Sequence, residues 1–278
     1  MAYKERFDGR KVNELRPMEA KVGVIPNADG SAVFKVGKTI AYVAVYGPRT
    51  LTRRSMQDPT KGIIRCHYNM MPFSGSGERI RPGTKRRSQE ISMVMEKSLT
   101  PVVNLGEFPN SVVDIFIELP QTDAGTRCAA ISAASIALAA AGIPMKDLVS
   151  SVAMGEVDGT VVADLTYDEE AYEGGPVSDI PIAMLNNTKE ISLLQMDGEI
   201  SKESLLKALE MAKEATDKVY KVQVAALMEK YDRGDSESKK TLPTEPSVEP
   251  VIEESKEENV KEAELSEDAK TPAKEDSQ

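Results

Sequence analysis

The sequence predicts an α+β protein, an α/β sandwich in which sheets and helices pack as layers. Runs of β-branched and aromatic residues alternate with segments of helical periodicity along residues 1–232. Several β-rich runs are separated by short turns, which favours hairpins over a strict alternation of strand and helix. Hydrophobic residues make up 40% of the 278 residues, aromatic residues 5%, and Trp is absent. The core must therefore be built from Val, Ile, Leu, Ala and Met.

The first half of this region predicts a hairpin, two further strands and two helices. The expected elements are strands at 31–37, 39–46, 63–70 and 112–119 and helices at 88–99 and 126–141. A Gly-Lys pair separates the first two strands, as in a hairpin. The first helix has apolar residues on one face, and the second is rich in Ala, the best helix former. Gly142 is expected to end the second helix.

The second half repeats this theme. The expected elements are strands at 151–154, 160–165, 179–185 and 190–195 and a helix from 201 to about 231. Ser201 is expected at the start of that helix as part of its N-cap region. We therefore expect one folded region, 1–232, with two sub-parts of about 1–148 and 149–232.

Charge is distributed unevenly along the chain. The formal net charge is −10, from 35 Lys+Arg and 45 Asp+Glu. Residues 233–278 hold 7 basic and 14 acidic residues, which leaves 28 basic and 31 acidic residues in 1–232. The terminal segment has four prolines and no aromatic residue, so it cannot bury enough apolar surface to offset its ordering entropy. We predict a disordered acidic tail at 233–278 and a folded region whose mild acidity does not exclude a polyanionic ligand.

The composition excludes several classes of function. His67 is the only histidine, so a His-dependent catalytic triad or a His-rich zinc site is almost ruled out. Cys66 and Cys128 have no CxxC or metal-site spacing. No run of about 18 apolar residues exists, and the charged N-terminus lacks the apolar segment of a secretory signal. We therefore expect a cytoplasmic protein with no membrane contact.

The segment 123–130 (DAGTRCAA) is the strongest local candidate for a binding site. A turn containing glycine follows a predicted strand and leads directly into the Ala-rich helix. Backbone N–H groups and the positive dipole at a helix start attract anions. Arg127 adds a planar fork that matches phosphate oxygens. On this pattern alone, an ordinary helix start with a surface arginine remains an alternative.

A basic run and an acidic cluster are the other two candidates. The run 79–87 (RIRPGTKRR) holds five cations and precedes a predicted helix, as in segments that hold RNA backbones, although a solvated loop is the alternative. The acidic cluster contains Asp164, Asp168, Glu169, Glu170, Glu173 and Asp179. Asp179 opens an apolar strand after a Gly-rich loop at 174–176. A carboxylate there could act as a general acid or hold a divalent cation, and a polar loop before a strand is the alternative.

These segments occur in one order together with a charged N-terminal string. The order is Arg6-x-Asp8-Gly9-Arg10, Glu14-x-Arg16-Pro17, Met71-Pro72-Phe73-Ser74, Arg86-Arg87, the 123–130 segment and Asp179-Ile180-Pro181. In this order the motifs resemble those of the RNase PH family over about residues 4–231. Within that family, they are most similar to the catalytic ring subunits of archaeal exosomes.

The resemblance implies a fold and a reaction. The fold would be an RNase PH domain of the ribosomal protein S5 domain 2-like type over residues 1–232. Inorganic phosphate, as co-substrate, would attack the terminal phosphodiester and release a nucleoside diphosphate from the RNA 3′ end. Because the nucleophile is a substrate, the chain needs no nucleophilic side chain of its own. Implied partners are RNA 3′ ends, a homologous inactive subunit that completes a hexamer of three heterodimers, and RNA-binding cap proteins.

The resemblance also implies roles for individual residues. Gly125, Thr126, Arg127 and Cys128 would bind phosphate, Arg86 and Arg87 would grip the RNA backbone, and Asp179 would be catalytic. Asp179 would protonate the departing 3′ oxygen or help to hold Mg²⁺, with Glu173 as the leading candidate for a second carboxylate. Tyr68 is a candidate for stacking an RNA base, and a half-buried strand residue is the alternative.

Two other functions remain open at this point. One is a catalytically inactive ring subunit that binds RNA, and the other is a bacterial-type RNase PH that trims tRNA as a homohexamer. The simultaneous presence of Arg86, Arg87, Arg127 and Asp179 favours the catalytic subunit, because an inactive partner should lack some of them.

Overall fold

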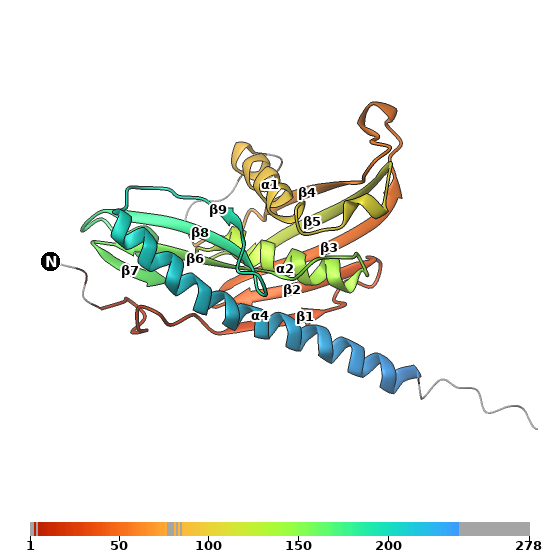
Figure 1. The fold of residues 1–278 in the computed structure, drawn as a ribbon. Coiled ribbons are helices and arrows are strands. Elements are labelled where there is room, and N and C mark those ends of the chain that lie inside the picture. The colour runs from red at the N-terminus through yellow and green to blue at the C-terminus, as the bar shows by residue number, and fades with distance from the viewer. Residues whose placement is uncertain (1–2, 4, 77–80, 82, 84, 239–278) are drawn as a thin grey trace, which may run out of the picture.

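The structure, a computed structural model, describes residues 3, 5–76, 81, 83 and 85–238, with side chains up to residue 232. The chain folds into two sheets with helices packed against them (Figure 1). In chain order the strands and α-helices are β1 (Met18–Val22), β2 (Gly30–Val36), β3 (Thr39–Thr50), β4 (Ile63–Met70), α1 (Arg86–Leu99), β5 (Ser111–Gln121), α2 (Thr126–Ala140), β6 (Val149–Val157), β7 (Thr160–Ala163), α3 (Tyr167–Glu170), β8 (Val177–Leu185), β9 (Ile191–Leu194) and α4 (Lys202–Ser238).

The first sheet contains five strands in the order β1-β2-β3-β5-β4. The predicted hairpin is confirmed, since β2 and β3 pair antiparallel around Gly37, whose φ is 55°. The β4 and β5 strands are parallel, and α1 lies in the connection between them. The short β1 was not among the predicted strands, although its residues alternate between apolar and charged.

The second sheet contains four antiparallel strands in the order β7-β6-β8-β9. All four were predicted, with ends that differ by a few residues. The single turn α3 was not predicted. It is held by a capping box in which Thr166 accepts a hydrogen bond from the Glu169 N–H and the Glu169 carboxylate accepts one from the Thr166 N–H.

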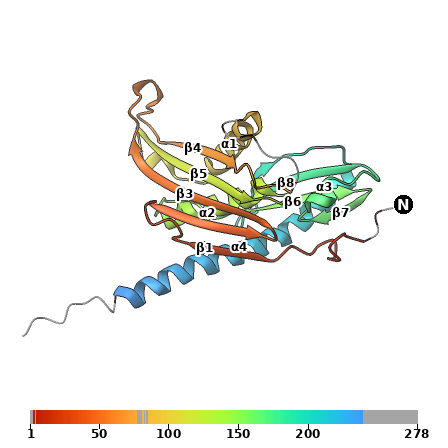
Figure 2. The same ribbon diagram turned by 180° about the vertical axis from the view of Figure 1, so that it is seen from behind.

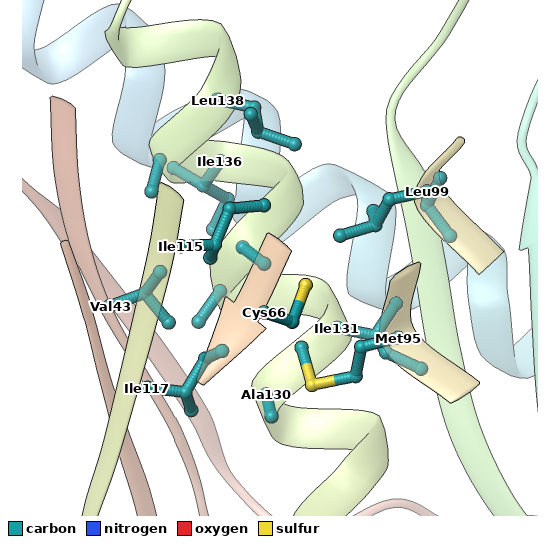
Figure 3. Packing of buried hydrophobic residues seen from close by; sticks show 14 of the residues in the cluster. Val43, Cys66, Met95, Leu99, Ile115, Ile117, Ala130, Ile131, Ile136 and Leu138 are labelled. Carbon is teal, nitrogen blue, oxygen red and sulfur yellow. The ribbon is translucent and has the colours of Figure 1, made fainter. Parts of the chain in front are cut away.

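The core is organised around α2, which packs on β2 and β3 of the first sheet and on β6 of the second. Apolar side chains of α2 such as Ile131 and Ile136 lie among buried residues of β3, β5 and α1 (Figure 3). Most α2 residues are buried, and many of them are alanine, so the strands approach closely. At Gly30, in β2, an added Cβ would lie only 2.3 Å from the carbonyl oxygen of Ala137. The apolar residues that fix α2 between the layers thereby also fix its N-terminus.

The ends of α2 and α4 test two sequence expectations. Gly142 ends α2 as predicted: its φ is 74°, its N–H donates to the Ala139 carbonyl, and the Ile143 N–H donates to the Leu138 carbonyl in a Schellman motif.

The α4 helix, which was expected to end near Tyr231, continues to Ser238 and crosses the second sheet (Figures 1 and 2). Extending a formed helix costs little, so polar residues continue it.

The first six residues of the predicted tail are therefore helical, and residues 239–278 lie outside the described residues. Within the described part of the chain, no helix is long and apolar enough to span a membrane.

Candidate active site

The α2 N-terminus is presented by a turn with unusual backbone angles. Ala124 and Gly125 both have positive φ, 51° and 60°, and Gly125 is the N-cap residue. The first helical N–H that bonds back is that of Ala129, to the Gly125 carbonyl oxygen at 3.1 Å. The N–H groups of Thr126, Arg127 and Cys128 therefore have no acceptor within the helix, and no side chain caps them. This arrangement suits an anion.

The Arg127 side chain connects this helix end to the second sheet. Its Nη1 donates a hydrogen bond to Gln195 Oε1 at 2.8 Å, and its Nη2 lies 3.5 Å from Asp179 Oδ2. Arg127 and Asp179 are each 18% exposed, so both can still contact a ligand.

A cavity of about 320 Å³ joins most of the predicted site residues. Its walls include Tyr68, Arg87, Gly125, Thr126, Arg127, Cys128 and Asp179 from the predicted set, and Lys85, Ser76, Thr122, Tyr167 and Glu170 in addition. Most of these residues come from β4, the start of α1, the start of α2, α3 and β8, whereas Ser76 and Thr122 lie in the loops after β4 and β5. Segments that are more than 100 residues apart in the sequence thus line the same cavity.

Asp179 has an unusual environment for a carboxylate. It is the third residue of β8, and its backbone pairs with Asp197 through two hydrogen bonds of 2.9 Å. Burial raises the pKa of Asp179 to about 6, and the nearby charges of Glu170 and Asp197 add to that rise. The Arg127 charge opposes it but does not cancel it. A carboxyl group with such a pKa can hold a proton near neutral pH and release it to a neighbour.

The two arginines at the start of α1 lie on connected surfaces. Arg87 lines the cavity, whereas Arg86 lines an adjoining groove of about 630 Å³ together with Arg87, Arg127 and Gln195. Both arginines are exposed, as contacts with a phosphodiester backbone require. In the rest of the basic run, Arg79, Ile80, Pro82 and Thr84 lie outside the described residues.

Tyr68 lines the cavity, although only 4% of the residue is exposed. This burial favours the alternative of a strand residue packed into the core, and the stacking of an RNA base on Tyr68 stays a prediction. Strand periodicity turns Cys66 and Tyr68 toward the core, whereas His67, on the opposite face, stacks on Phe116 at 4.7 Å.

The second carboxylate on the cavity wall is Glu170, and Glu173 does not line the cavity. The reason lies in α3, where Glu169 turns inward and is fully buried against Arg6, with Arg6 Nε 2.7 Å from Glu169 Oε1. Glu170 follows at the end of this turn, and Glu173 lies beyond it in an exposed loop. Among the described residues, no group of three or more His, Cys, Asp or Glu is arranged to hold a metal ion.

Cys128 can act at this site only through its backbone. Its side chain is 4% exposed, and burial raises the pKa of the thiol to about 12. The thiolate form is therefore rare near neutral pH, and a nucleophilic role is disfavoured.

Gln195 and Glu170 are the main site residues that sequence reasoning missed. Glu170 belonged to a noted acidic cluster, but the turn that selects it over its neighbours is a tertiary feature. Gln195 follows β9, carries no motif, and meets Arg127 only through the pairing of β9 with β8.

Comparisons with known proteins agree with this geometry. Residues 14–144 match domain 1 of the 3′ exoribonuclease family (RNase PH), and residues 147–215 match domain 2. The chain is 48% identical over 227 residues to the exosome complex component Rrp41 of Thermococcus kodakarensis, covering 82% of this chain and 90% of that protein. It is 47% identical over 226 residues to Rrp41 of Methanopyrus kandleri, covering 81% and 93%. Among solved structures, rice Rrp46 is similar with a TM-score of 0.70 and 27% identity, covering 80% of this chain and 100% of that chain.

Proposed function

The chain belongs to the RNase PH family of 3′ exoribonucleases, and from this premise we propose that it is the catalytic subunit of an exosome ring. The enzyme shortens RNA from the 3′ end with inorganic phosphate and releases nucleoside diphosphates. The observation that carries this proposal is the convergence of Arg127, Asp179 and the uncapped α2 N-terminus on one cavity.

Phosphate is the nucleophile in this mechanism. The N–H groups of Thr126, Arg127 and Cys128, together with the Arg127 guanidinium, hold it at the helix end. A phosphate oxygen forms a bond to the phosphorus of the terminal phosphodiester, and the bond from that phosphorus to the 3′ oxygen of the preceding nucleotide breaks. The acceptor of the terminal nucleotidyl group is phosphate, so the reaction is a phosphorolysis that yields a nucleoside diphosphate and not a hydrolysis.

Asp179 supplies the proton in this proposal. The departing 3′ oxygen gains negative charge as its bond breaks, and a carboxyl group with a pKa of about 6 can donate a proton to it. Arg127 lies beside Asp179 and stabilises charge on the transferring group. Arg87 on the cavity wall and Arg86 on the adjoining groove hold the RNA backbone so that its last phosphodiester faces the phosphate.

Binding of a Mg²⁺ ion is the alternative role for Asp179, because a carboxylate that holds the ion is ionised and does not donate the proton. Asp179 and Glu170 offer carboxylate oxygens on the cavity wall, and Mg²⁺ is usually held by one or two carboxylates together with water and substrate phosphates. When bound, the ion would neutralise charge on phosphoryl oxygens. Every step above uses backbone and side-chain groups of this chain, and none of them requires the ion.

The proposal extends to the assembly. The similarity to exosome components supports a place in a ring with other subunits, and we propose a hexamer of three heterodimers with a homologous inactive subunit. RNA-binding cap proteins would then select substrates. Arg127 lies beside Asp179, whose pKa is raised. A subunit without catalytic activity does not require this pair, so its presence favours the catalytic role.

Phosphorolysis of a labelled RNA tests the proposed function. The chain is purified alone and with its ring partner, and the release of nucleoside diphosphates is measured with and without phosphate. We expect release that depends on phosphate and proceeds from the 3′ end. RNA binding without any release would identify an inactive subunit, and full activity of the chain alone as a homohexamer would identify a bacterial-type RNase PH.

A further inference from the structure

Arg16 lies behind the proposed phosphate site and does not line its cavity. Its side chain is buried, with 6% of the residue exposed, and it precedes β1 in the N-terminal segment. Its guanidinium donates to Asp164 from Nε at 2.9 Å and from Nη2 at 2.7 Å, and its backbone N–H donates to the same carboxylate at 2.8 Å. This bidentate pair fixes the orientation of the guanidinium plane.

The remaining nitrogen of the Arg16 fork reaches the turn that carries the phosphate site. Arg16 Nη1 donates a hydrogen bond to the carbonyl oxygen of Asp123 and lies 3.6 Å from Asp123 Oδ2. Asp123 follows β5 of the first sheet, whereas Asp164 follows β7 of the second. One buried side chain thus ties both sheets to the turn.

Thr39 holds the same turn from the opposite side. Its Oγ1 accepts a hydrogen bond from the Asp123 N–H at 2.9 Å and lies within hydrogen-bond distance of the carbonyl oxygens of Asp123 and Ala124, at 3.0 and 2.9 Å. Thr39 is fully buried at the start of β3. The backbone of Asp123 is therefore held by hydrogen bonds with two side chains, Arg16 and Thr39, that lie far from it in the sequence.

The turn needs such support because of its conformation. Ala124 and Gly125 are consecutive left-handed residues, and an alanine rarely adopts a positive φ unless its surroundings impose it. The N–H groups of the next three residues are the proposed phosphate ligands, so a relaxed turn would misdirect them. A displacement of about 1 Å at such a site can cost two orders of magnitude in rate.

We propose that Arg16 and Thr39 are positioning residues that clamp the turn at Asp123 and Ala124 so that the α2 N-terminus is preorganised to bind phosphate. The proposal rests on the proposed function, because it assigns these residues to the phosphate site of that reaction. Arg16 and Thr39 act through the turn and do not touch phosphate.

The test measures the affinity for phosphate separately from the affinity for RNA. Arg16→Lys keeps the charge beside Asp164 but lacks the fork that also reaches Asp123, and Thr39→Val removes the hydroxyl with little change in shape. Thr39→Ser, which keeps the hydroxyl, is the matched control. Each variant is assembled with the ring partner, and KM for phosphate, kcat, the Kd for RNA without phosphate and the thermal midpoint are compared with the wild type.

We expect Arg16→Lys and Thr39→Val to raise KM for phosphate about tenfold or more, with the RNA Kd unchanged and Thr39→Ser close to the wild type. Ala124→Gly in the Arg16→Lys background should recover part of the phosphate affinity, since glycine adopts a positive φ without strain. An unchanged KM for phosphate, or an equal loss of phosphate and RNA affinity, would overturn the proposal. A wild type without phosphate-dependent release would instead overturn the proposed function.

If Arg16→Lys does not fold, the Thr39→Val and Thr39→Ser pair decides the question. Thr39→Val keeps the branched shape and loses the hydroxyl, whereas Thr39→Ser keeps the hydroxyl and loses the methyl group, so a KM for phosphate that rises only in Thr39→Val reports on the hydroxyl contacts to the turn. Equal KM values for phosphate in these two variants would overturn the proposal.

Discussion

Arg127 Nη2 lies 3.5 Å from Asp179 Oδ2, although the two residues belong to a helix packed on the first sheet and a strand of the second. The contact joins the proposed phosphate ligand to the proposed acid across the boundary between the two family domains. Its length leaves room for the guanidinium to contact a substrate oxygen while it still faces the carboxylate. The reacting groups are thus held by two separate layers of the fold.

Replacement of Asp179 by Asn should abolish phosphorolysis and leave RNA binding near normal. The amide keeps the shape of the side chain but cannot donate a proton as an acid does. The release of nucleoside diphosphates and the RNA Kd are measured on the same preparation. Undiminished turnover would remove Asp179 from the chemistry.

The pH dependence of kcat should reflect the raised pKa of Asp179. If the protonated carboxyl is the acid, kcat falls as pH rises through about 6 and above, by about tenfold per pH unit. Bound phosphate and RNA add negative charge and would shift this fall to higher pH. The measurement is made at saturating phosphate, so that ionisation of free phosphate does not dominate. A kcat that rises through this range would assign Asp179 to metal binding or to a base.

Asp179→Asn should also stabilise the fold near neutral pH. The pKa of Asp179 is about 6 when folded and near 3.8 when unfolded, so the wild type loses stability as pH rises between these values. The loss amounts to roughly 3 kcal/mol when the pKa difference is converted to free energy. Urea unfolding of both proteins is measured at pH 4 and pH 7.5. The free energy of unfolding of the variant should increase relative to that of the wild type between these two pH values. A difference that does not change with pH would contradict the environment described for this carboxyl group.

The double variant Arg86→Ala and Arg87→Ala should bind RNA more weakly and with a flatter salt dependence. Each phosphate contact on a single strand contributes about 0.7 to the slope of log K against log salt, so the slope should fall by about 1.4. The matched control is Lys207→Ala with Lys218→Ala, two exposed cations on α4 that do not line the cavity or its groove. An unchanged slope in the arginine variant would place the RNA path elsewhere.

Deletion of residues 233–278 should leave activity and thermal stability largely intact, because the folded core and the site lie in 1–232. A deeper truncation after Thr216 provides the contrast, since it removes the fully buried Gln223. The amide of Gln223 donates to the carbonyl oxygens of Ser132 and Val149 at 3.0 and 2.9 Å. We expect this second truncation to unfold the chain, as judged by circular dichroism. Loss of activity in the shorter deletion would give the tail a role in catalysis or assembly.

The acidic tail also explains why total charge is a poor guide to the ligand. Of the net charge of −10, residues 233–278 carry −7, and within the folded region Arg86, Arg87 and Arg127 line the cavity or its groove. A phosphate or an RNA backbone responds to the charge within about a Debye length, near 10 Å, so the local arrangement outweighs the total.

The sequence by itself determined the order of the elements and pointed to most of the predicted residues that line the cavity. Strand alternation, helical periodicity and the Gly142 stop are local signals, and they identified all of the main elements except β1 and α3. Segment 123–130 could be predicted as a candidate anion site because a helix start needs only its own backbone to attract an anion.

The tertiary structure alone decided which side chains contact one another and which face of each strand is buried in the core. Sequence alternation places Tyr68 and His67 on opposite faces of β4, but only the packing of the core buries Tyr68. Only the fold of α3 brings Glu170 and not Glu173 to the cavity, and only the pairing of β8 with β9 brings Gln195 to Arg127. The Arg16 clamp likewise joins residues more than 100 positions apart. Local patterns report the conformation of one segment, whereas burial and contact depend on how distant segments pack.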